Sequence, residues 1–188
     1  AMPVTDDVEV NVAVRYDDYS DFGDNTAPKI SLRWQALDNL VVRASYSEAF
    51  RAPGLDELNA ADSFSAEDAI DYVNGETTSK QFDTWYRANA DLGPETSEYT
   101  NFGIAWDVTD NFGIKLDYFN LKIDDVIQTK TVQALIEDEQ RGELTALSAD
   151  ADTSNTTFYL KRSPSGKLIE AGTGYYNGAG FDIEGIDL

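Results

Sequence analysis

Apolar and polar residues alternate along several segments of the sequence, and this alternation limits the fold more than any other feature. In the first segment the even positions from Val8 to Tyr16 are apolar, and the odd positions from Glu9 to Asp17 are mostly polar. A period of two predicts β-strands with one apolar and one polar face. About six such strands are expected, in an all-β antiparallel meander, at residues 7–17, 29–35, 40–47, 101–107, 112–119 and, more weakly, 175–188.

The connections between these segments differ sharply in length. Residues 36–39 and 108–111 form short turns, whereas residues 48–97 and 124–174 form long loops. Short turns at one end of a sheet and long loops at the other are typical of an outer-membrane β-barrel, whose strands also carry aromatic residues near both membrane interfaces. Periodicity alone favours a soluble antiparallel sheet with one wet face, because such sheets are commoner and give the same alternation. The residues at the expected girdle positions are Trp34, Tyr46, Trp106, Phe112 and Tyr118.

The amino-acid composition excludes several classes of function. The formal net charge of −21 disfavours binding to the phosphates of nucleic acids. The sequence has no Cys and no His, which removes thiolate and imidazole metal sites, Ser-His-Asp triads and the commonest general base. No catalytic residues and no cofactor are therefore expected, and the protein is predicted not to be an enzyme.

An acidic cluster near the N-terminus is the one candidate metal site. Carboxylate oxygens are the ligands that calcium prefers, but the cluster lacks the residue order of an EF-hand. A solvated turn is the alternative interpretation. The four candidate calcium ligands are Asp17, Asp18, Asp21 and Asp24.

Three arginines, Arg15, Arg33 and Arg43, fall on the polar faces of three consecutive predicted strands. They could pair with acids of the same sheet, such as Glu9 and Asp17, or bind an anionic ligand. In a barrel these faces would line the lumen, so the three arginines are lumen-facing candidates. Structural pairing is the simpler expectation, because guanidinium and carboxylate groups satisfy each other on a mixed wall.

The two long loops differ in chemistry. Residues 56–98 hold eleven acids against Lys80 and Arg87, which predicts a mostly solvated segment. Residues 131–150 have apolar residues at near-helical spacing with a break at Gly142, which predicts two short helices. Residues 157–172 then predict a hairpin that turns at residues 163–166.

The stretch PKISLRWQALDNLVVRASYSEAFRAPGLDEL resembles the barrel of TonB-dependent outer-membrane receptors. Its motif residues are Phe50, Arg51, Ala52 and Pro53, followed by a Leu-x-Glu-Leu-like segment. Similar stretches follow the family's order: RYDDYSDFG, LGPETSEYTNFGIAWD, LDYFNLKIDDVI, and KRSPSGKL with YYNGAGFDIEGIDL. The last pair resembles a branch whose long loop carries an Arg-x-Pro-x-Gly hairpin.

The resemblance implies a location in the outer membrane of a Gram-negative bacterium. The implied partners are membrane lipid, a small solute and the TonB system, reached through an N-terminal plug and TonB box that these residues do not include. Such barrels have about 22 strands, so residues 1–188 are expected to form a single partial barrel segment. The implied function is uptake of a scarce solute: a siderophore, cobalamin, an oligosaccharide or a peptide.

A soluble secreted β-sheet module that binds glycans or protein partners is the alternative function. It would place Trp34, Phe102 and Trp106 in a closed core or on a ligand platform instead of against lipid.

Overall fold

The computed structural model describes residues 2–20 and 23–188. These residues separate into two compact units. The first unit contains residues 2–20, 23–52, 93–126 and 178–188. The second contains residues 53–92 and 127–177, which are the greater part of the two long connections expected from the sequence.

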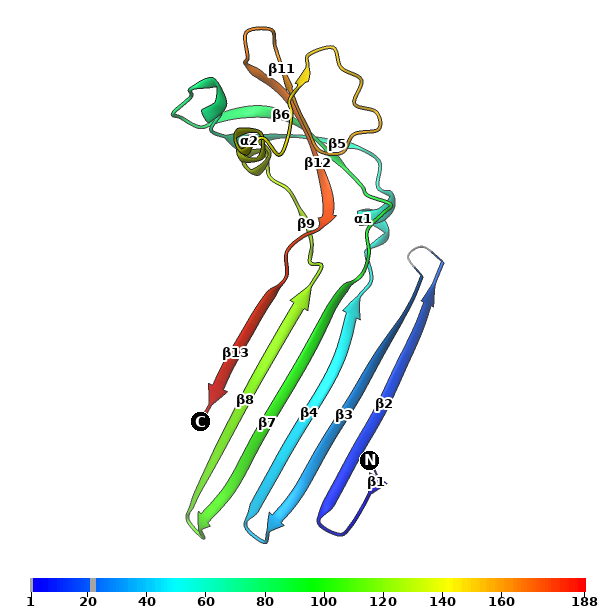
Figure 1. Ribbon diagram of the computed structural model, residues 1–188, viewed down its shortest axis with the longest axis vertical. Coiled ribbons are helices and arrows are strands. Elements are labelled where there is room, and N and C mark those ends of the chain that lie inside the picture. Colours follow the sequence, from blue (N-terminus) through cyan, green and yellow to red (C-terminus); the bar gives the residue numbers. More distant parts are fainter. Residues whose placement is uncertain (1, 21–22) are drawn as a thin grey trace. The chain divides into compact units, whose positions relative to one another are not determined.

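The first unit is one antiparallel sheet whose strands follow the order β1-β2-β3-β4-β7-β8-β13 (Figure 1). Six of its seven strands are long, as the alternation predicted, and the sheet formed by the described residues is open. The bounds are Met2–Pro3 for β1, Val8–Tyr19 for β2, Gly23–Leu37 for β3, Leu40–Arg51 for β4, Glu95–Thr109 for β7, Phe112–Asp124 for β8 and Phe181–Asp187 for β13.

The register places the predicted apolar residues on one face. One row across five strands reads Val8, Trp34, Val42, Ile104 and Leu116. We call this the apolar face of the first unit and the opposite one the polar face. Trp34, Phe102 and Trp106 on the apolar face are 45% to 48% exposed.

The prediction of one last strand over residues 175–188 was wrong. Tyr175 to Asn177 end β12 (Leu168–Asn177), which belongs to the second unit, and only β13 completes the first sheet. Residues 178–180 interrupt the strand, because the Gly178 amide donates to the Val126 carbonyl instead of to a ladder partner. A Cβ at Gly180 would lie 2.0 Å from the Ile123 carbonyl oxygen.

The second unit has a smaller sheet in the order β10-β11-β12-β6-β5, with β9 paired to β12. The pairing of β12 with β6 is parallel and joins the two chain segments of this unit. The bounds are Leu55–Asn59 for α1, Ser63–Ala69 for β5, Tyr72–Asn74 for η1, Lys80–Arg87 for β6, Ile127–Thr129 for β9, Val132–Arg141 for α2, Leu147–Ser148 for β10 and Tyr159–Arg162 for β11.

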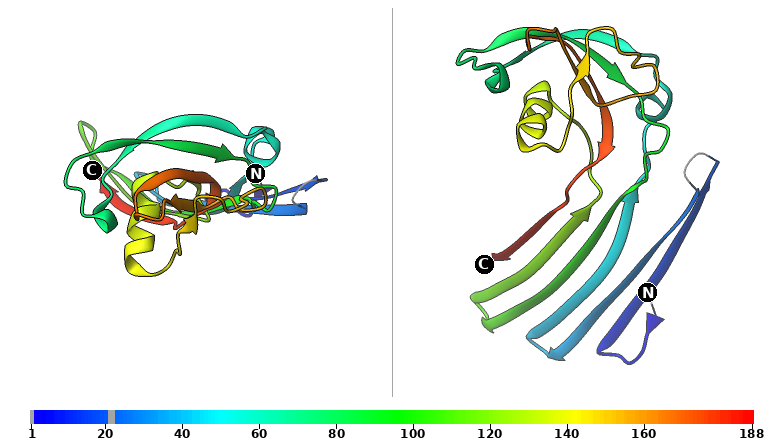
Figure 2. Two further views of the ribbon diagram at one scale, coloured as in Figure 1. Left: turned by 90° about the horizontal axis from the view of Figure 1, so that it is seen from above. Right: turned by 45° about the horizontal axis from the view of Figure 1, so that its top comes forward.

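Helix α2 and this sheet enclose the main core of the second unit (Figure 2). The helix begins after Thr131, whose side chain accepts from the Ala134 amide, and ends at Gly142 in the left-handed conformation. Such a glycine is a common helix terminator, because it has no Cβ to clash at positive φ. The largest fully buried side chains are Leu135, Ile136, Tyr159, Leu160 and Leu168.

The expected helix up to Gly142 and the hairpin after it are therefore confirmed. The second expected helix was wrong, because Leu147 forms the two-residue strand β10 beside β11. Leu144 packs against the core without a helix of its own. In the described residues, no helix is long and apolar enough to cross a membrane.

The composition of residues 56–98 predicted a mostly solvated segment, and this prediction was wrong. The segment supplies β5 and β6, and Phe82 and Leu92 are buried. Its excess of acids is compatible with this fold because strands with one buried face need only every second residue to be apolar.

Candidate functional site

Five charged side chains of the first unit lie in one row of its polar face. Arg33 and Arg43 are direct neighbours in this row, with Glu9 beside Arg33 and Gly103 beside Arg43. The row continues through Asp117 to Asp187. Two adjacent cations are thus flanked by acids on both sides.

Arg43 reaches across a whole strand to pair with Asp117. Its Nε lies 3.1 Å from Oδ1 of Asp117, and its Nη2 contacts Oδ2. The pair spans β7 at Gly103, where a Cβ would lie 2.1 Å from the carboxylate and 2.6 Å from Nε. Only glycine leaves room for this bidentate pair.

The other two arginines bond within their own strands. Arg15 pairs with Asp17, one of the acids expected from the sequence. Arg33 donates to Oε1 of Gln35 at 2.7 Å. All three arginines lie on the polar face, and their assignment to a barrel lumen stays a prediction.

The polar face has a shallow depression of about 320 Å³ around Arg33 and Arg43. Asn11, Ser31 and Ser45 also line it. Guanidinium, amide and hydroxyl groups can hold polar partners by hydrogen bonds, which is the chemistry of a binding wall.

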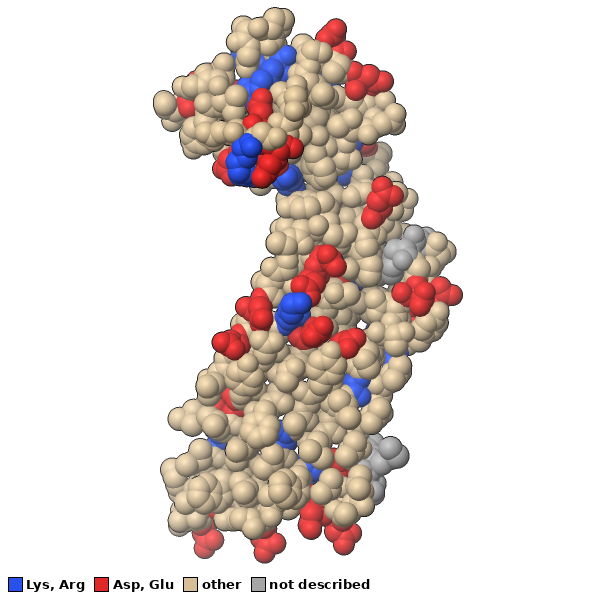
Figure 3. Space-filling model, viewed as in Figure 1, with Lys and Arg blue, Asp and Glu red and all other residues tan. Residues whose placement is uncertain are grey.

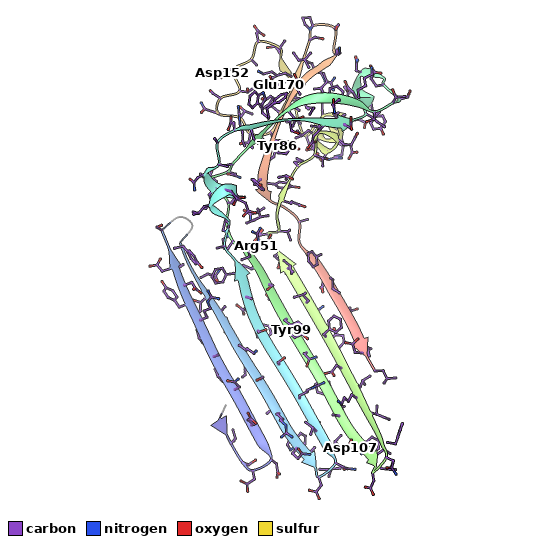
Figure 4. All side chains as sticks on the ribbon, turned by 180° about the vertical axis from the view of Figure 1, so that it is seen from behind. Arg51, Tyr86, Tyr99, Asp107, Asp152 and Glu170 are labelled. Atoms are coloured by element: carbon purple, nitrogen blue, oxygen red, sulfur yellow. The ribbon has the colours of Figure 1, made fainter. Side chains whose placement is uncertain are left out.

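The Phe-Arg-Ala-Pro motif lies where β4 leaves the first unit. Arg51, labelled in Figure 4, forms a bidentate pair with Glu95 on the neighbouring strand β7, with distances of 2.9 and 3.0 Å. The ring of Phe50 lies 5.8 Å from the Arg15 guanidinium and meets Tyr19 edge to face. Pro53 is buried. These contacts support a structural role for the motif.

The second unit contains a buried ion-pair network centred on Arg162. Its guanidinium binds both carboxylate oxygens of Asp71 at 2.8 Å and both oxygens of Glu139 at 2.6 to 3.1 Å. It also donates to the Gly166 carbonyl. Arg162 therefore joins the start of η1, helix α2 and the turn between β11 and β12.

Burial and pairing act in opposite directions on this network. Burial raises the pKa of Asp71, but hydrogen bonds and charge from Arg162 outweigh it, so that the pKa is lowered. The hydrogen bonds that Arg162 donates to Asp71 and its pairing with Glu139 raise the pKa of Arg162. Asp71 and Arg162 are therefore both charged at neutral pH.

A second polar contact set fixes residues 153–156. Arg87 donates to the carbonyls of Thr153 and Thr156 and pairs with Asp62 at 2.9 Å. The guanidinium also lies 5.6 Å from the ring of Tyr159. That ring covers Gly172, where a Cβ would lie 2.0 Å away.

The structure does not gather the candidate calcium ligands. Asp17 and Asp18 are consecutive in β2 and thus point to opposite faces. Asp18 is paired in register with Asp24, and Asp21 lies outside the described residues. No group of three or more carboxylates suited to a metal occurs in the described part of the chain.

Sequence reasoning missed the Arg162 network and the contacts of Arg87. Arg162 had a signal, because it is the first residue of the Arg-x-Pro-x-Gly stretch. Its partners Asp71 and Glu139 lie 91 and 23 residues away, and nothing in the local sequence connects them.

A family model described as "TonB dependent receptor-like, beta-barrel" matches residues 1–188. Among curated proteins, a hemin receptor of Yersinia pestis is 29% identical over 138 residues, which cover 65% of this chain and 19% of the relative. A probable TonB-dependent siderophore receptor, PirA of Acinetobacter baumannii, is 26% identical over 107 residues, which cover 56% of this chain and 13% of the relative. The chain thus spans a fifth or less of these relatives.

Solved structures support the same fold. The crystal structure of the siderophore receptor PirA from Acinetobacter baumannii matches with a TM-score of 0.65 at 20% identity, covering 98% of this chain and 23% of that one. A variant of the ferric enterobactin receptor PfeA from Pseudomonas aeruginosa also gives 0.65, at 21% identity, covering 98% and 22%.

Proposed function

The chain belongs to the TonB-dependent receptor family, and from this premise we propose that it is part of the wall of an outer-membrane receptor that takes up a scarce solute. The family consists of receptors of the Gram-negative outer membrane, and its members are not enzymes. Uptake by the whole protein would draw its energy from the TonB system, through residues outside this segment.

The observation that carries the proposal is the exposed apolar face of the first unit. Val12, Ile30, Trp34 and Phe102 are about half exposed on it. Both buried apolar clusters found among residues 2–20 and 23–188 lie in the second unit instead. A large exposed apolar surface in one sheet is stable against lipid and costly in water.

The same exposure disfavours the soluble secreted module. That alternative requires Trp34, Phe102 and Trp106 in a closed core or on a small ligand platform, but they lie half exposed on two strands, β3 and β7, that are separated by β4. Lipid contact accounts for the whole face at once.

An iron-carrying solute is the class we favour. The two curated relatives are named for hemin and for siderophores. The chain's net charge of −21 would repel free anions and favour cationic, neutral or metal-carrying solutes at long range. The polar face, with Arg15, Arg33 and Arg43, would line the interior of the barrel, and the long connections 48–97 and 124–174 would be extracellular loops.

Uptake by cells tests the proposal. A strain without its own iron receptors would express the intact receptor and be given radiolabelled ferric siderophore, hemin or cobalamin. We expect uptake of an iron chelate that stops when TonB is removed. Uptake that persists without TonB, or of cobalamin alone, would contradict the proposal.

A further inference from the structure

The sheet of the second unit ends in a strand whose outer edge is open. Strand β5 pairs with β6 and is the last strand in the order β10-β11-β12-β6-β5. Its first four residues, 63–66, are all exposed. Within the described ranges 2–20 and 23–188, these four residues have no backbone hydrogen bonds beyond the ladder with β6. An open strand edge presents amide and carbonyl groups that can pair with another strand.

The open part of β5 is short because helix α2 holds the rest of the strand. The Glu67 carboxylate accepts from the Val132 amide at 3.1 Å. The Ile70 amide donates to the Gln133 side chain at 2.8 Å. Natural sheets usually protect an open edge with a charge, a proline or a bulge. Residues 63–66 have neither a charge nor a proline, and they pair with β6 without a register shift.

The face of β5 and β6 away from α2 carries an exposed aromatic pair. Phe82 is buried in the core with α2, and alternate residues of a strand point to opposite faces, so Trp85 lies on the other face. Phe64 is the register partner of Trp85, and their ring centroids are 5.3 Å apart. Phe64 is 54% exposed. An apolar side chain of an added strand would pack beside Phe64.

Two acids without ion-pair partners lie on the same face as the aromatic pair. Asp83 is the register partner of Ala66, and Asp68 follows Ala66 by two positions on β5. Both carboxylates are exposed, and neither forms an ion pair in the part of the chain that the structure describes. The uncharged edge therefore has a negatively charged face, which favours a cationic partner.

A lysine on an added strand would reach Asp83 across Ala66. The two residues would be two strand spacings apart, or about 10 Å. Arg43 already spans two spacings in the first unit, where it binds Asp117 across Gly103. That bidentate arginine pair requires glycine at the crossing. Ala66 carries only a methyl group, over which the flexible stem of a lysine can pass to deliver a single point charge.

The charges that flank the open edge disfavour a second copy of the chain. If residues 63–66 of two copies paired antiparallel about a two-fold axis, Asp62 of one copy would face Glu67 of the other. Like charges directly opposite each other destabilise a sheet. The chain also has a net charge of −21, and acidic side chains are more widespread than basic ones on both units in Figure 3. A basic strand would meet attraction at the same edge.

We propose that residues 63–66 of β5 are a docking edge for an extended basic segment of another protein, which joins the second sheet as an antiparallel strand. The segment places an apolar side chain beside Phe64 and a lysine opposite Ala66, where it pairs with Asp83. In such strand addition, main-chain hydrogen bonds supply affinity and alternate side chains supply specificity. This interaction goes beyond the proposed function, because solute uptake neither requires nor excludes it.

A synthetic peptide added to the intact receptor tests the edge. The probe is a fluorescent peptide with the sequence Lys-Thr-Lys-Thr-Val-Thr and blocked ends. In antiparallel register its valine lies beside Phe64, and its lysines lie opposite Ala66 and Asp68. Two further peptides carry N-methyl groups on either the odd or the even residues. Because alternate amides of a strand point to the same neighbour, only one of the two N-methylated peptides can still form the ladder with β5.

We expect saturable binding in fluorescence anisotropy, with an affinity that falls about tenfold or more for one N-methylated peptide and is kept by the other. Asp83→Asn should weaken binding about two- to fivefold, as expected for an exposed ion pair. The matched control is Glu137→Gln, which removes an exposed acid of α2 and should leave binding unchanged.

Three results would overturn the docking edge. One is the absence of saturable binding at probe concentrations up to about 1 mM. Another is an equal affinity of both N-methylated peptides or of Asp83→Asn, which would show adsorption by charge without strand pairing. The third is slow hydrogen exchange at the outward amides of residues 63–66 before the probe is added, because another segment of the receptor would then occupy the edge. The uptake assay above is independent of all three.

Discussion

Removal of Arg162 should destabilise the second unit more than any other single loss of a charge among its described residues. The side chains of Arg162, Asp71 and Glu139 are only 10%, 2% and 13% exposed. Replacing Arg162 with Met leaves two buried carboxylates facing each other without a cation. Breaking a buried pair in this way costs about 3 to 5 kcal/mol.

Hydrogen exchange on the intact receptor measures this cost locally. Since about 1.4 kcal/mol corresponds to a factor of ten, amides of α2 and β11 should exchange about a hundred to a few thousand times faster in Arg162→Met. The control is Arg141→Ala, because that side chain is 53% exposed and its partner Asp138 keeps Lys130. Exchange in this control should change little.

Two further comparisons distinguish the effect of unpaired buried charge from the effect of a changed side-chain shape. The triple variant Arg162→Met, Asp71→Asn, Glu139→Gln removes the charges together and should lose less protection than Arg162→Met alone, since the penalty comes from unpaired charge.

The pH dependence of the exchange protection should also reverse between the native protein and Arg162→Met. In the native protein the pKa of Asp71 is lowered, so its stabilising effect is present above the unfolded pKa and is lost as the pH falls through the folded pKa. In Arg162→Met, acid protonates the buried Asp71 carboxylate that has lost its cation, and this should restore protection. Unchanged exchange in Arg162→Met would refute the reasoning.

Three other predictions concern the sheet, a close contact and the isolated chain. Leu116→Arg on the apolar face should cost about 2 to 4 kcal/mol in folding of the intact receptor into liposomes, whereas Ser45→Arg on the polar face should cost far less. Equal costs would argue against a lipid-facing wall. Gly172→Ala should destabilise the second unit by about 1 to 3 kcal/mol through overpacking against Tyr159, and Tyr159→Leu in the same background should recover part of the loss in thermal unfolding; no loss in Gly172→Ala would contradict the contact. The isolated 188-residue chain should self-associate without detergent, because its sheet has open edges and an exposed apolar face, and a clean monomer in analytical ultracentrifugation would count against this.

Alternation alone placed the strands of the first unit and their apolar face, because burial or lipid contact on one side repeats every second residue. Their length was underestimated. β3 and β7 each have 15 residues, and their outer parts carry polar residues on both faces. Hydrogen bonding to neighbours extends a strand without leaving an apolar signal.

The second unit was largely invisible in the sequence. Residues 62–83 look dispensable because they are rich in acids, yet they contain β5, the buried Asp71 and Phe82. Their order depends on partners in residues 127–177, and such distant contacts leave no local pattern. The same holds for the candidate site. The position of Arg43 on the polar face was predictable from the local sequence, but its partner Asp117 across Gly103 was not.

The parallel pairing of β6 with β12 has a consequence for experiments that exchange loops between receptors. Residues 53–92 supply β5 and β6 of the second sheet. Residues 127–177 supply its other strands together with helix α2, which covers it. A graft of one segment alone would leave unpaired strand edges and an open core. The two segments therefore have to be exchanged together. A chimera that transfers a binding property should carry both from the same donor.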